Sequence, residues 1–332
     1  MKASLSTRKI ILNHLIDARA TGGTISGAAL AAELGISRNS VWKAIHSLQE
    51  EGYDIRSEQS KGYYLASAAD ILSQEAIEES IRRSGIPESV LSIQLFDSLD
   101  STNNYCKKLP YDGPATAVLA DYQSSGRGRL GRTFVSPKGT GIYLTYSFKP
   151  RFPIAQVTLV TTTAAVLTHR ILSEISGETL GIKWVNDIYR GSRKICGILT
   201  EALGGLENGN FERIIVGIGI NCLPQEFPAE LAGRAGSLTD SANPAWDRNE
   251  IAASLIAALH RALGEQENLD DPAYLDYYRE HCFIIGRSVD VLEAGKAPVP
   301  AYVTGIDSEY RLLVRTGEGE RALSGGEVSL KL

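Results

Sequence analysis

The spacing of the hydrophobic residues changes twice along this chain, and these changes constrain the fold more than any other feature. Residues 6–65 carry short helical patterns and two short alternating strands, whereas strands and helices alternate from about residue 70 to residue 281. From Ile284 the helical period disappears and only short strands follow. A length of 332 residues allows two domains, or three if some are small. We therefore predict an α+β chain with domains at residues 1–66, 67–282 and 283–332, the last a small β-barrel.

The first domain has the pattern of a helix-turn-helix followed by a hairpin wing. Gly35 separates two helical stretches, residues 28–34 and 38–51, which Ser26 and Ser37 are placed to cap. The second stretch has an apolar face opposite a hydrogen-bonding face, as a DNA recognition helix requires. The candidate DNA-binding residues on this polar face and its edge are Arg38, Asn39, Lys43, His46 and Ser47.

Charge supports this placement only weakly. The whole chain carries a formal net charge of −5, which disfavours binding to a polyanion, but residues 1–67 hold eight basic and six acidic residues. A three-helix bundle with a solvated third helix has the same pattern, so both interpretations stay open here. Because a charge of +2 attracts few phosphates, a DNA-binding form is expected to be a dimer.

The cysteines and the N-terminus indicate the compartment. Cys106, Cys196, Cys222 and Cys282 lie far apart without C-x-x-C spacing, which predicts neither a zinc site nor a disulfide framework. Charges interrupt the apolar residues near the N-terminus, so a signal peptide is not expected. The least charged long stretch, residues 154–169, is too short and too polar for a membrane span. The sequence predicts a cytoplasmic protein without membrane contact. The five scattered histidines predict no metal cluster.

The densest chemical signal is the segment Gly126–Arg132, in which three glycines alternate with three arginines and a leucine. Its glycines match G-x-G-x-x-G, but that dinucleotide fingerprint must open a helix, and Ser136-Pro137 prevents one. What remains is a loop with three guanidinium groups and accessible backbone N–H groups, suited to a phosphate or a mixed anhydride. A solvated basic loop is the alternative. Such a density of arginine in an acidic chain favours function.

Two further segments suggest a nucleotide site. Lys194 begins an apolar strand, where a lone lysine would usually extend into solvent. The preceding stretch, residues 183–187, adds Lys183, Asn186 and Asp187, and a lysine, an amide and a carboxylate together can bind a triphosphate with magnesium. Residues 217–221 contribute small residues that permit close backbone approach. The sequence has no phosphate-binding P-loop, so another device must hold a nucleotide.

Six motifs follow one another along the chain: Asp100-Ser-Thr-Asn103, Gln123 with the arginine loop, Lys-Trp-x-Asn-Asp, Arg-Lys-x-x-Gly-Ile-Leu-x-Glu, Gly-Ile-Gly-Ile-Asn and Gly-Gly-Glu-Val-Ser-Leu. Taken in this order, they resemble the motifs of the bifunctional bacterial biotin protein ligases that also repress the biotin operon. The resemblance covers essentially the whole chain. It implies a winged helix, a central mixed β-sheet with helices on one side, and a C-terminal SH3-like β-barrel.

The resemblance also implies the chemistry: biotin and ATP with Mg²⁺ give biotinyl-5′-AMP, and a lysine of the biotin carboxyl carrier protein then accepts the biotin. It implies binding to operator DNA and a homodimer when the adenylate is bound. Arg129, Lys194 and Asp187 are the implied catalytic residues. The implied ligand-binding residues are Ser101, Thr102, Asn103 and Gln123 at the biotin end, Gly126, Arg127, Gly128 and Arg129 in the loop, Arg132 and Phe134 at the nucleotide, and Lys183, Asn186, Lys194, Gly197 and Asn221 around the phosphates and the incoming amine.

Two departures and two alternatives accompany this resemblance. Val185 stands where the family often has proline, and Phe134 where a tryptophan is frequent. A lipoate or octanoate transferase shares the catalytic fold, but the arginine loop with a winged helix disfavours it. A regulator that only senses a small molecule would not need a loop built to retain a reactive adenylate.

Overall fold

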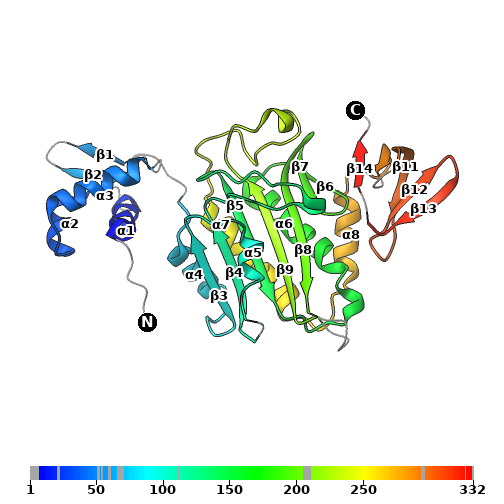
Figure 1. Ribbon diagram of the computed structural model, residues 1–332, viewed down its shortest axis with the longest axis horizontal. Coiled ribbons are helices and arrows are strands. Elements are labelled where there is room, and N and C mark those ends of the chain that lie inside the picture. Colours follow the sequence, from blue (N-terminus) through cyan, green and yellow to red (C-terminus); the bar gives the residue numbers. More distant parts are fainter. Residues whose placement is uncertain are drawn as a thin grey trace. The chain divides into compact units, whose positions relative to one another are not determined.

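The computed structural model describes residues 7–20, 23–50, 53, 55–58, 61–65, 71–110, 112–204, 211–292, 296–325 and 327–330. The chain divides into two compact units, Met1–Ile71 and Leu72–Leu332 (Figure 1). The predicted boundary between residues 66 and 67 lies outside the described residues. No helix of the described part of the chain is long and apolar enough to cross a membrane.

The first unit is a winged helix-turn-helix, as the sequence predicts. The Ser26 hydroxyl accepts hydrogen bonds from the N–H groups of Ala28 and Ala29, and the Ser37 hydroxyl accepts one from Ser40 N. Both predicted caps are therefore in place. The elements are α1 Thr7–Ala20, α2 Gly27–Glu33, α3 Arg38–Glu50, β1 Ile55–Glu58 and β2 Gly62–Leu65, with β1 and β2 paired antiparallel.

The apolar face of α3 makes the core of this unit. Val41, Ala44, Ile45 and Leu48 are buried against residues of α1, α2 and the wing. The opposite face is solvent-exposed at four of its five predicted DNA-binding residues. Ser47 is the exception, because it is half-buried and accepts a 3.1 Å hydrogen bond from Arg8 Nη1.

The second unit is built on a seven-stranded mixed sheet of order β3-β4-β5-β9-β8-β7-β6 (Figure 1). Neighbouring strands are antiparallel except β3 and β4, which are parallel. The residue patterns predict strands over residues 91–96, 117–122, 141–148, 195–202 and 211–221, which correspond to β3, β4, β5, β8 and β9. They do not predict the hairpin of β6 and β7. The strands are β3 Leu91–Phe96, β4 Ala115–Ala120, β5 Gly141–Phe148, β6 Leu180–Lys183, β7 Asp187–Arg190, β8 Arg193–Leu203 and β9 Arg213–Asn221.

The long helices cover one face of this sheet, and the short α5 lies on the other (Figure 1). Alternate residues of the strands explain this division: Leu119 and Val216 join the main core beneath the long helices, whereas Val118 and Ile215 pack with Cys106 of α5. The helices are α4 Gln74–Arg83, α5 Thr102–Cys106, α6 Leu159–Ser176, α7 Arg248–Leu259 and α8 Pro272–His281. Two predicted helices were too long. The pattern predicts a helix over residues 102–109, but α5 ends at Cys106, and it predicts one over residues 248–265, but α7 ends at Leu259 and a π-turn over His260–Gly264 follows.

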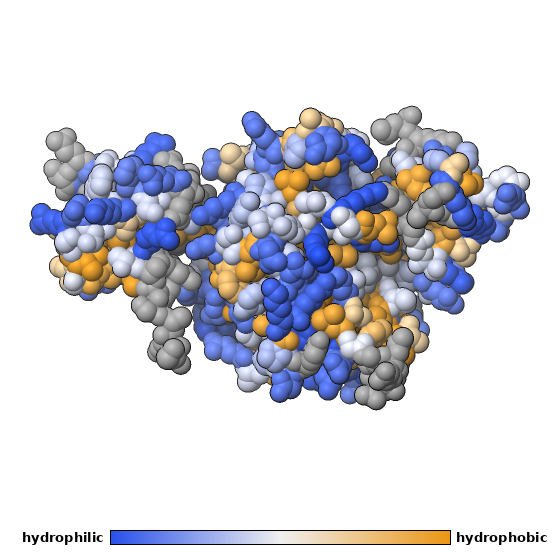
Figure 2. All heavy atoms as spheres, in the orientation of Figure 1, coloured by the Kyte–Doolittle hydropathy of each residue, from blue (hydrophilic) through white to orange (hydrophobic). Residues whose placement is uncertain are grey.

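The C-terminal strands form the predicted SH3-like antiparallel sheet, in the order β13-β12-β11-β10-β14. Trp184 Nε1 donates a 2.9 Å hydrogen bond to Tyr310 O, and Arg279 Nε donates one of 2.9 Å to Ile306 O, so this sheet shares the core of the second unit. On the face shown in Figure 2, hydrophobic residues lie scattered among hydrophilic ones. The strands are β10 Ser288–Leu292, β11 Val299–Ile306, β12 Leu312–Thr316, β13 Gly319–Leu323 and β14 Glu327–Leu330.

Candidate active site

A cavity of about 450 Å³ opens over β8 and β9 of the central sheet. The start of α5, the loop after β4 and the turn between β6 and β7 form its walls, which brings together segments that are far apart in the sequence. Gly126 does not line this cavity, although it was predicted to bind ligand. The predicted residues that do line it are Ser101, Thr102, Asn103, Gln123, Arg127, Gly128, Arg129, Arg132, Phe134, Lys183, Asn186, Asp187, Lys194, Gly197 and Asn221.

Glycines on β8 and β9 make the floor of the cavity shallow enough for other side chains to lie on it. Gly197 and Gly219 face one another across the two strands. A Cβ on Gly219 would lie 2.6 Å from the Phe134 ring, and one on Gly217 would collide with the Asn103 amide. The small residues of this motif therefore let Phe134 and Asn103 lie directly on the sheet, as their spacing suggested.

A buried hydrogen-bond network fixes the end of the cavity beside the start of α5. The Gln123 Oε1 atom accepts a 2.8 Å bond from Thr102 N, and Gln123 Nε2 donates a 2.9 Å bond to Ser136 Oγ. The Thr145 hydroxyl lies 2.7 Å from Thr102 Oγ1 and contributes from β5. Because these partners determine which way the Gln123 amide points, the start of α5 and the loop after β4 form one rigid wall.

Glu201 supports the same wall through its contact with Asn103, and it was assigned no role from the sequence. Its carboxylate accepts a 2.9 Å hydrogen bond from Asn103 Nδ2 and forms a 2.6 Å ion pair with Lys107 Nζ. Burial raises the pKa of Glu201, but the Lys107 ammonium and the Asn103 amide outweigh burial and leave that pKa below its ordinary value. Glu201 therefore stays ionised and orients Asn103.

The arginine segment folds as a narrow hairpin. Gly128 N donates to Arg132 O at 2.7 Å, and Phe134 N donates to Gly126 O at 2.9 Å. A Cβ on Gly126 would lie 2.7 Å from Ser136 Oγ, so a glycine is needed at the base of the hairpin. At the tip, Leu130 has a φ of 56° and is 76% exposed. A non-glycine residue held in the left-handed region is strained, and such strain concentrates at functional loops.

The two implied catalytic cations meet at the turn between β6 and β7. Arg129 Nη1 donates a 2.8 Å hydrogen bond to Asn186 Oδ1, and Lys194 Nζ forms a 2.7 Å ion pair with Asp187 Oδ1. Asn186 Nδ2 in turn donates to Ile198 O at 2.7 Å. One turn thus orients both the guanidinium and the ammonium, and an anion placed between them would face two positive charges.

The loop at residues 234–236, which no sequence motif predicts, fixes the backbone of Lys194. Lys194 N donates to Arg234 O at 2.8 Å, and Gly236 N donates to Lys194 O at 2.9 Å. Asn221 Nδ2 joins this loop by a 3.1 Å bond to Gly236 O. No spacing or motif signals these contacts. The other cavity residues outside the predicted set include Phe227, Leu231, Arg234, Ala235 and Val328.

This fold and cavity define a protein of the biotin and lipoate ligase class. Residues 95–221 match the Biotin/lipoate A/B protein ligase family, residues 12–64 match an HTH domain, and residues 284–331 match the Biotin protein ligase C terminal domain. The chain is 30% identical to the bifunctional ligase/repressor BirA of Bacillus subtilis over 97% of this chain and 99% of that protein. The Escherichia coli protein of the same name is also 30% identical, over 96% of each chain. The chain therefore belongs to the BirA family of bifunctional ligase/repressor proteins.

A solved structure supports the assignment of the catalytic fold. The biotin protein ligase from Aquifex aeolicus in complex with biotin and ATP matches with a TM-score of 0.58 and 28% identity, over 72% of this chain and 98% of that chain. The predicted family and architecture are thus confirmed.

Proposed function

We propose that this protein is an ATP-dependent biotin protein ligase that also represses transcription in response to biotin. One observation carries the ligase assignment: the arginine hairpin, Lys194 and the polar wall at Gln123 line one cavity, although they come from separate segments. A cavity with an uncharged hydrogen-bonding end and a cationic end suits a molecule with a polar ring, an apolar chain and a carboxylate. Family membership identifies that molecule as biotin.

In the first half-reaction, a carboxylate oxygen of biotin attacks the α-phosphorus of ATP, the bond to the β-phosphate breaks, and pyrophosphate leaves. Two anions must approach one another, and this repulsion is a main part of the barrier. Lys194 and Arg129 reduce it because the β6–β7 turn already holds their charges in place. Thr102, Asn103 and Gln123 line the part of the cavity that binds biotin.

In the second half-reaction, the uncharged amine of a carrier-protein lysine attacks the acyl carbon of biotinyl-5′-AMP, and AMP leaves. Until that amine arrives, water must be kept from the mixed anhydride. The arginine hairpin performs this protection by closing over the adenylate. Phe134, which packs closely against Gly219, supplies an aromatic ring on the nucleotide side.

Magnesium would arrive with the triphosphate. The described residues contain no cluster of three or more acidic, histidine or cysteine side chains that could hold a metal. Magnesium is commonly held by one or two carboxylates together with substrate phosphates. Asp187 is the carboxylate among the described cavity residues, so it fits such an ion and would hold it. The ion would neutralise charge on the phosphates.

The first unit supplies the DNA-binding function. Its α3 buries one face and exposes Arg38, Asn39, Lys43 and His46 on the other, which is the arrangement of a recognition helix in the major groove. We assign operator DNA as one macromolecular partner and the biotin carboxyl carrier protein as the other. The adenylate-bound form is a homodimer, and the protein acts in the cytoplasm.

The ligase assignment predicts which acid the enzyme activates. With MgATP and labelled pyrophosphate, biotin should support pyrophosphate exchange, whereas lipoate and octanoate should not. The same mixture with an apo carrier domain should biotinylate one lysine, detected by mass spectrometry. Exchange with lipoate or octanoate but not with biotin would instead assign the protein to the acyl transferases that share this fold.

Arg129→Gly should release the adenylate, while adenylate formation, which Lys194 still supports, continues. The substitution removes the 2.8 Å bond to Asn186 that ties the hairpin to the opposite wall. Biotinyl-AMP should escape into solution and label lysines of a bystander protein such as albumin, because a closed loop is what excludes stray amines. Lys138→Ala, an exposed lysine on the same loop but outside the cavity, serves as the control. Equal labelling of albumin by Arg129→Gly and the wild type would refute this role.

A further inference from the structure

Arg248 is buried at the N-terminus of α7, where a positive charge does not stabilise the helix. It is the first residue of α7 and is only 1% exposed. The N-terminus of a helix carries a partial positive charge, which disfavours a guanidinium there. Burial of a charge is also unfavourable unless it is paired. The reason for this residue must therefore be sought in what it contacts.

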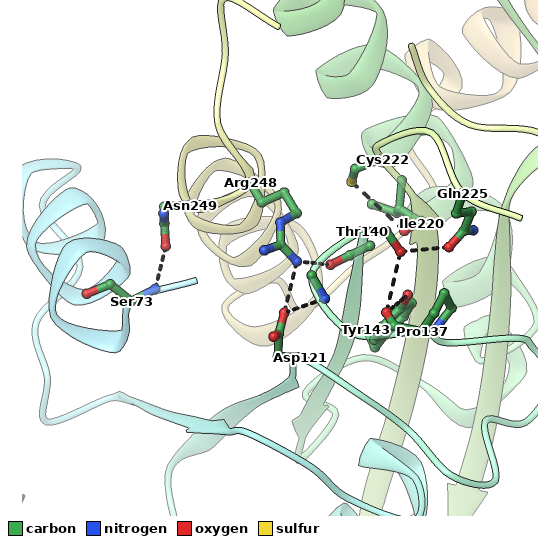
Figure 3. A network of polar contacts seen from close by, with 12 residues as sticks. Ser73, Asp121, Pro137, Thr140, Tyr143, Ile220, Cys222, Gln225, Arg248 and Asn249 are labelled. Carbon is green, nitrogen blue, oxygen red and sulfur yellow. Dashed lines mark hydrogen bonds and ion pairs between the residues drawn. The ribbon is translucent and has the colours of Figure 1, made fainter. Parts of the chain in front are cut away.

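Arg248 connects the two ends of the segment that carries the arginine hairpin. Its Nη1 atom lies 3.0 Å from Asp121 Oδ1 (Figure 3) and 2.8 Å from Gly141 O. Asp121 directly follows β4, and Gly141 is the first residue of β5. The segment between these two points includes Gln123 and the hairpin, which line the cavity, and Ser136, which is hydrogen-bonded to Gln123.

Asp121 adds a second bond within the same closure. Its Oδ1 atom also accepts a 3.2 Å hydrogen bond from Gly139 N, so the carboxylate contacts both Arg248 and the loop just before β5. The last β4–β5 pair is Ala120 with Tyr143, and beyond it the strands separate into the loop. Arg248 and Asp121 thus join the two stems of the loop at the point where β4 and β5 are no longer paired.

We propose that Arg248 is a positioning residue for the adenylate: by tying both stems of residues 122–140, it sets how the arginine hairpin closes over the ligand. The proposal rests on the proposed ligase function. Arg248 does not line the cavity and does not touch the ligand, so it acts through the stems. A small displacement of a loop stem is expected to change ligand retention strongly, since misplacement by about 1 Å can cost roughly 100-fold.

The neighbouring residue provides a matched control. Asn249 lies on the same helix end and is the next residue of α7, but its Oδ1 atom accepts a 2.7 Å bond from Ser73 N, before α4 (Figure 3). Asn249→Ala therefore disturbs the same end of α7 through the bond to Ser73, while the bonds from Arg248 to Asp121 and Gly141 stay in place.

The test variant is the double substitution Asp121→Asn with Arg248→Gln, which removes both charges and leaves no buried charge unpaired. Full-length protein is loaded with biotin and α-labelled ATP, and release of biotinyl-AMP is timed after dilution into unlabelled adenylate. We expect release to be roughly 10- to 100-fold faster than in the wild type and in Asn249→Ala. Arg248→Lys, which keeps the charge beside Asp121 but not the planar fork, should fall between them.

A second readout does not depend on activity. Trypsin should cleave the ligand-free double variant within Arg127–Arg132 faster than it cleaves the ligand-free wild type, at a temperature well below both melting transitions. Wild-type rates of release and of cleavage in the folded double variant would overturn the proposal. If the double variant does not fold, Arg248→Lys is judged by the same two rates. A wild type that forms no adenylate refutes the ligase function instead, while the cleavage rates still decide whether Arg248 positions the loop.

Discussion

Lys194→Ala should lower the rate of biotinyl-AMP formation by roughly 100- to 1000-fold, the usual cost of removing one fixed group that stabilises developing charge. The Lys194 ammonium is paired with Asp187 at 2.7 Å, and both backbone groups of this lysine are held by the loop at residues 234–236. Its charge is therefore in place before the carboxylate and the α-phosphate approach. Removing it leaves their repulsion uncompensated, so kcat should fall much more than the affinity for biotin.

Stability should change little in the same variant, and this separates the catalytic role from a structural one. The Lys194 and Asp187 side chains are 33% and 21% exposed, and a pair this accessible contributes about 1 kcal/mol or less. Pyrophosphate exchange and thermal unfolding should be measured together, with Lys108→Ala as the control, since Lys108 is exposed and outside the cavity. A rate loss matched by a comparable loss of folded protein would contradict the assignment.

Local signals predicted most of the fold. The caps at Ser26 and Ser37, and the apolar stripe of α3, depend on residues within one or two turns of each other, so they can be inferred directly from the sequence. The hairpin of β6 and β7 was missed for the opposite reason. Its strands have four residues each, too few for an alternating pattern to stand out, and their position is fixed by pairing with β8.

The same distinction applies to the candidate site. The arginine hairpin and Lys194 were identified because their composition is unusual within a few residues. The contacts that fix the surrounding walls were not predicted, since Glu201 lies 98 residues from its partner Asn103 and Arg248 lies 127 residues from its partner Asp121 in the sequence. The steric requirement for a glycine at position 126 likewise comes from a residue ten positions away, Ser136. Sequence composition thus locates reactive groups, whereas only the fold reveals what holds them.

Biotinyl-AMP should increase operator affinity by about 5- to 150-fold, the range of a typical coupling free energy between two sites. The first unit carries one short recognition helix and an excess of only two basic residues up to position 67, so one copy neutralises few phosphates. A dimer places two copies of α3 on half-sites related by twofold symmetry and doubles these contacts. Ordering of the arginine hairpin by the adenylate would supply the free energy that favours dimerisation.

The test combines analytical ultracentrifugation with DNA binding to a duplex that the ligand-bound protein selects from a random pool. Both are measured with and without biotinyl-AMP over a range of salt concentrations. Because each neutralised phosphate adds about 0.9 to the slope of log affinity against log salt, the ligand-bound dimer should show a steeper slope than the ligand-free protein. Removing residues 1–66 should abolish DNA binding and leave ligation measurable. Apo carrier domain should compete with DNA, because it consumes the adenylate that favours the dimer. Equal affinity and equal slope with and without ligand would show that DNA binding is not coupled to the biotin site, even if the ligase activity stands.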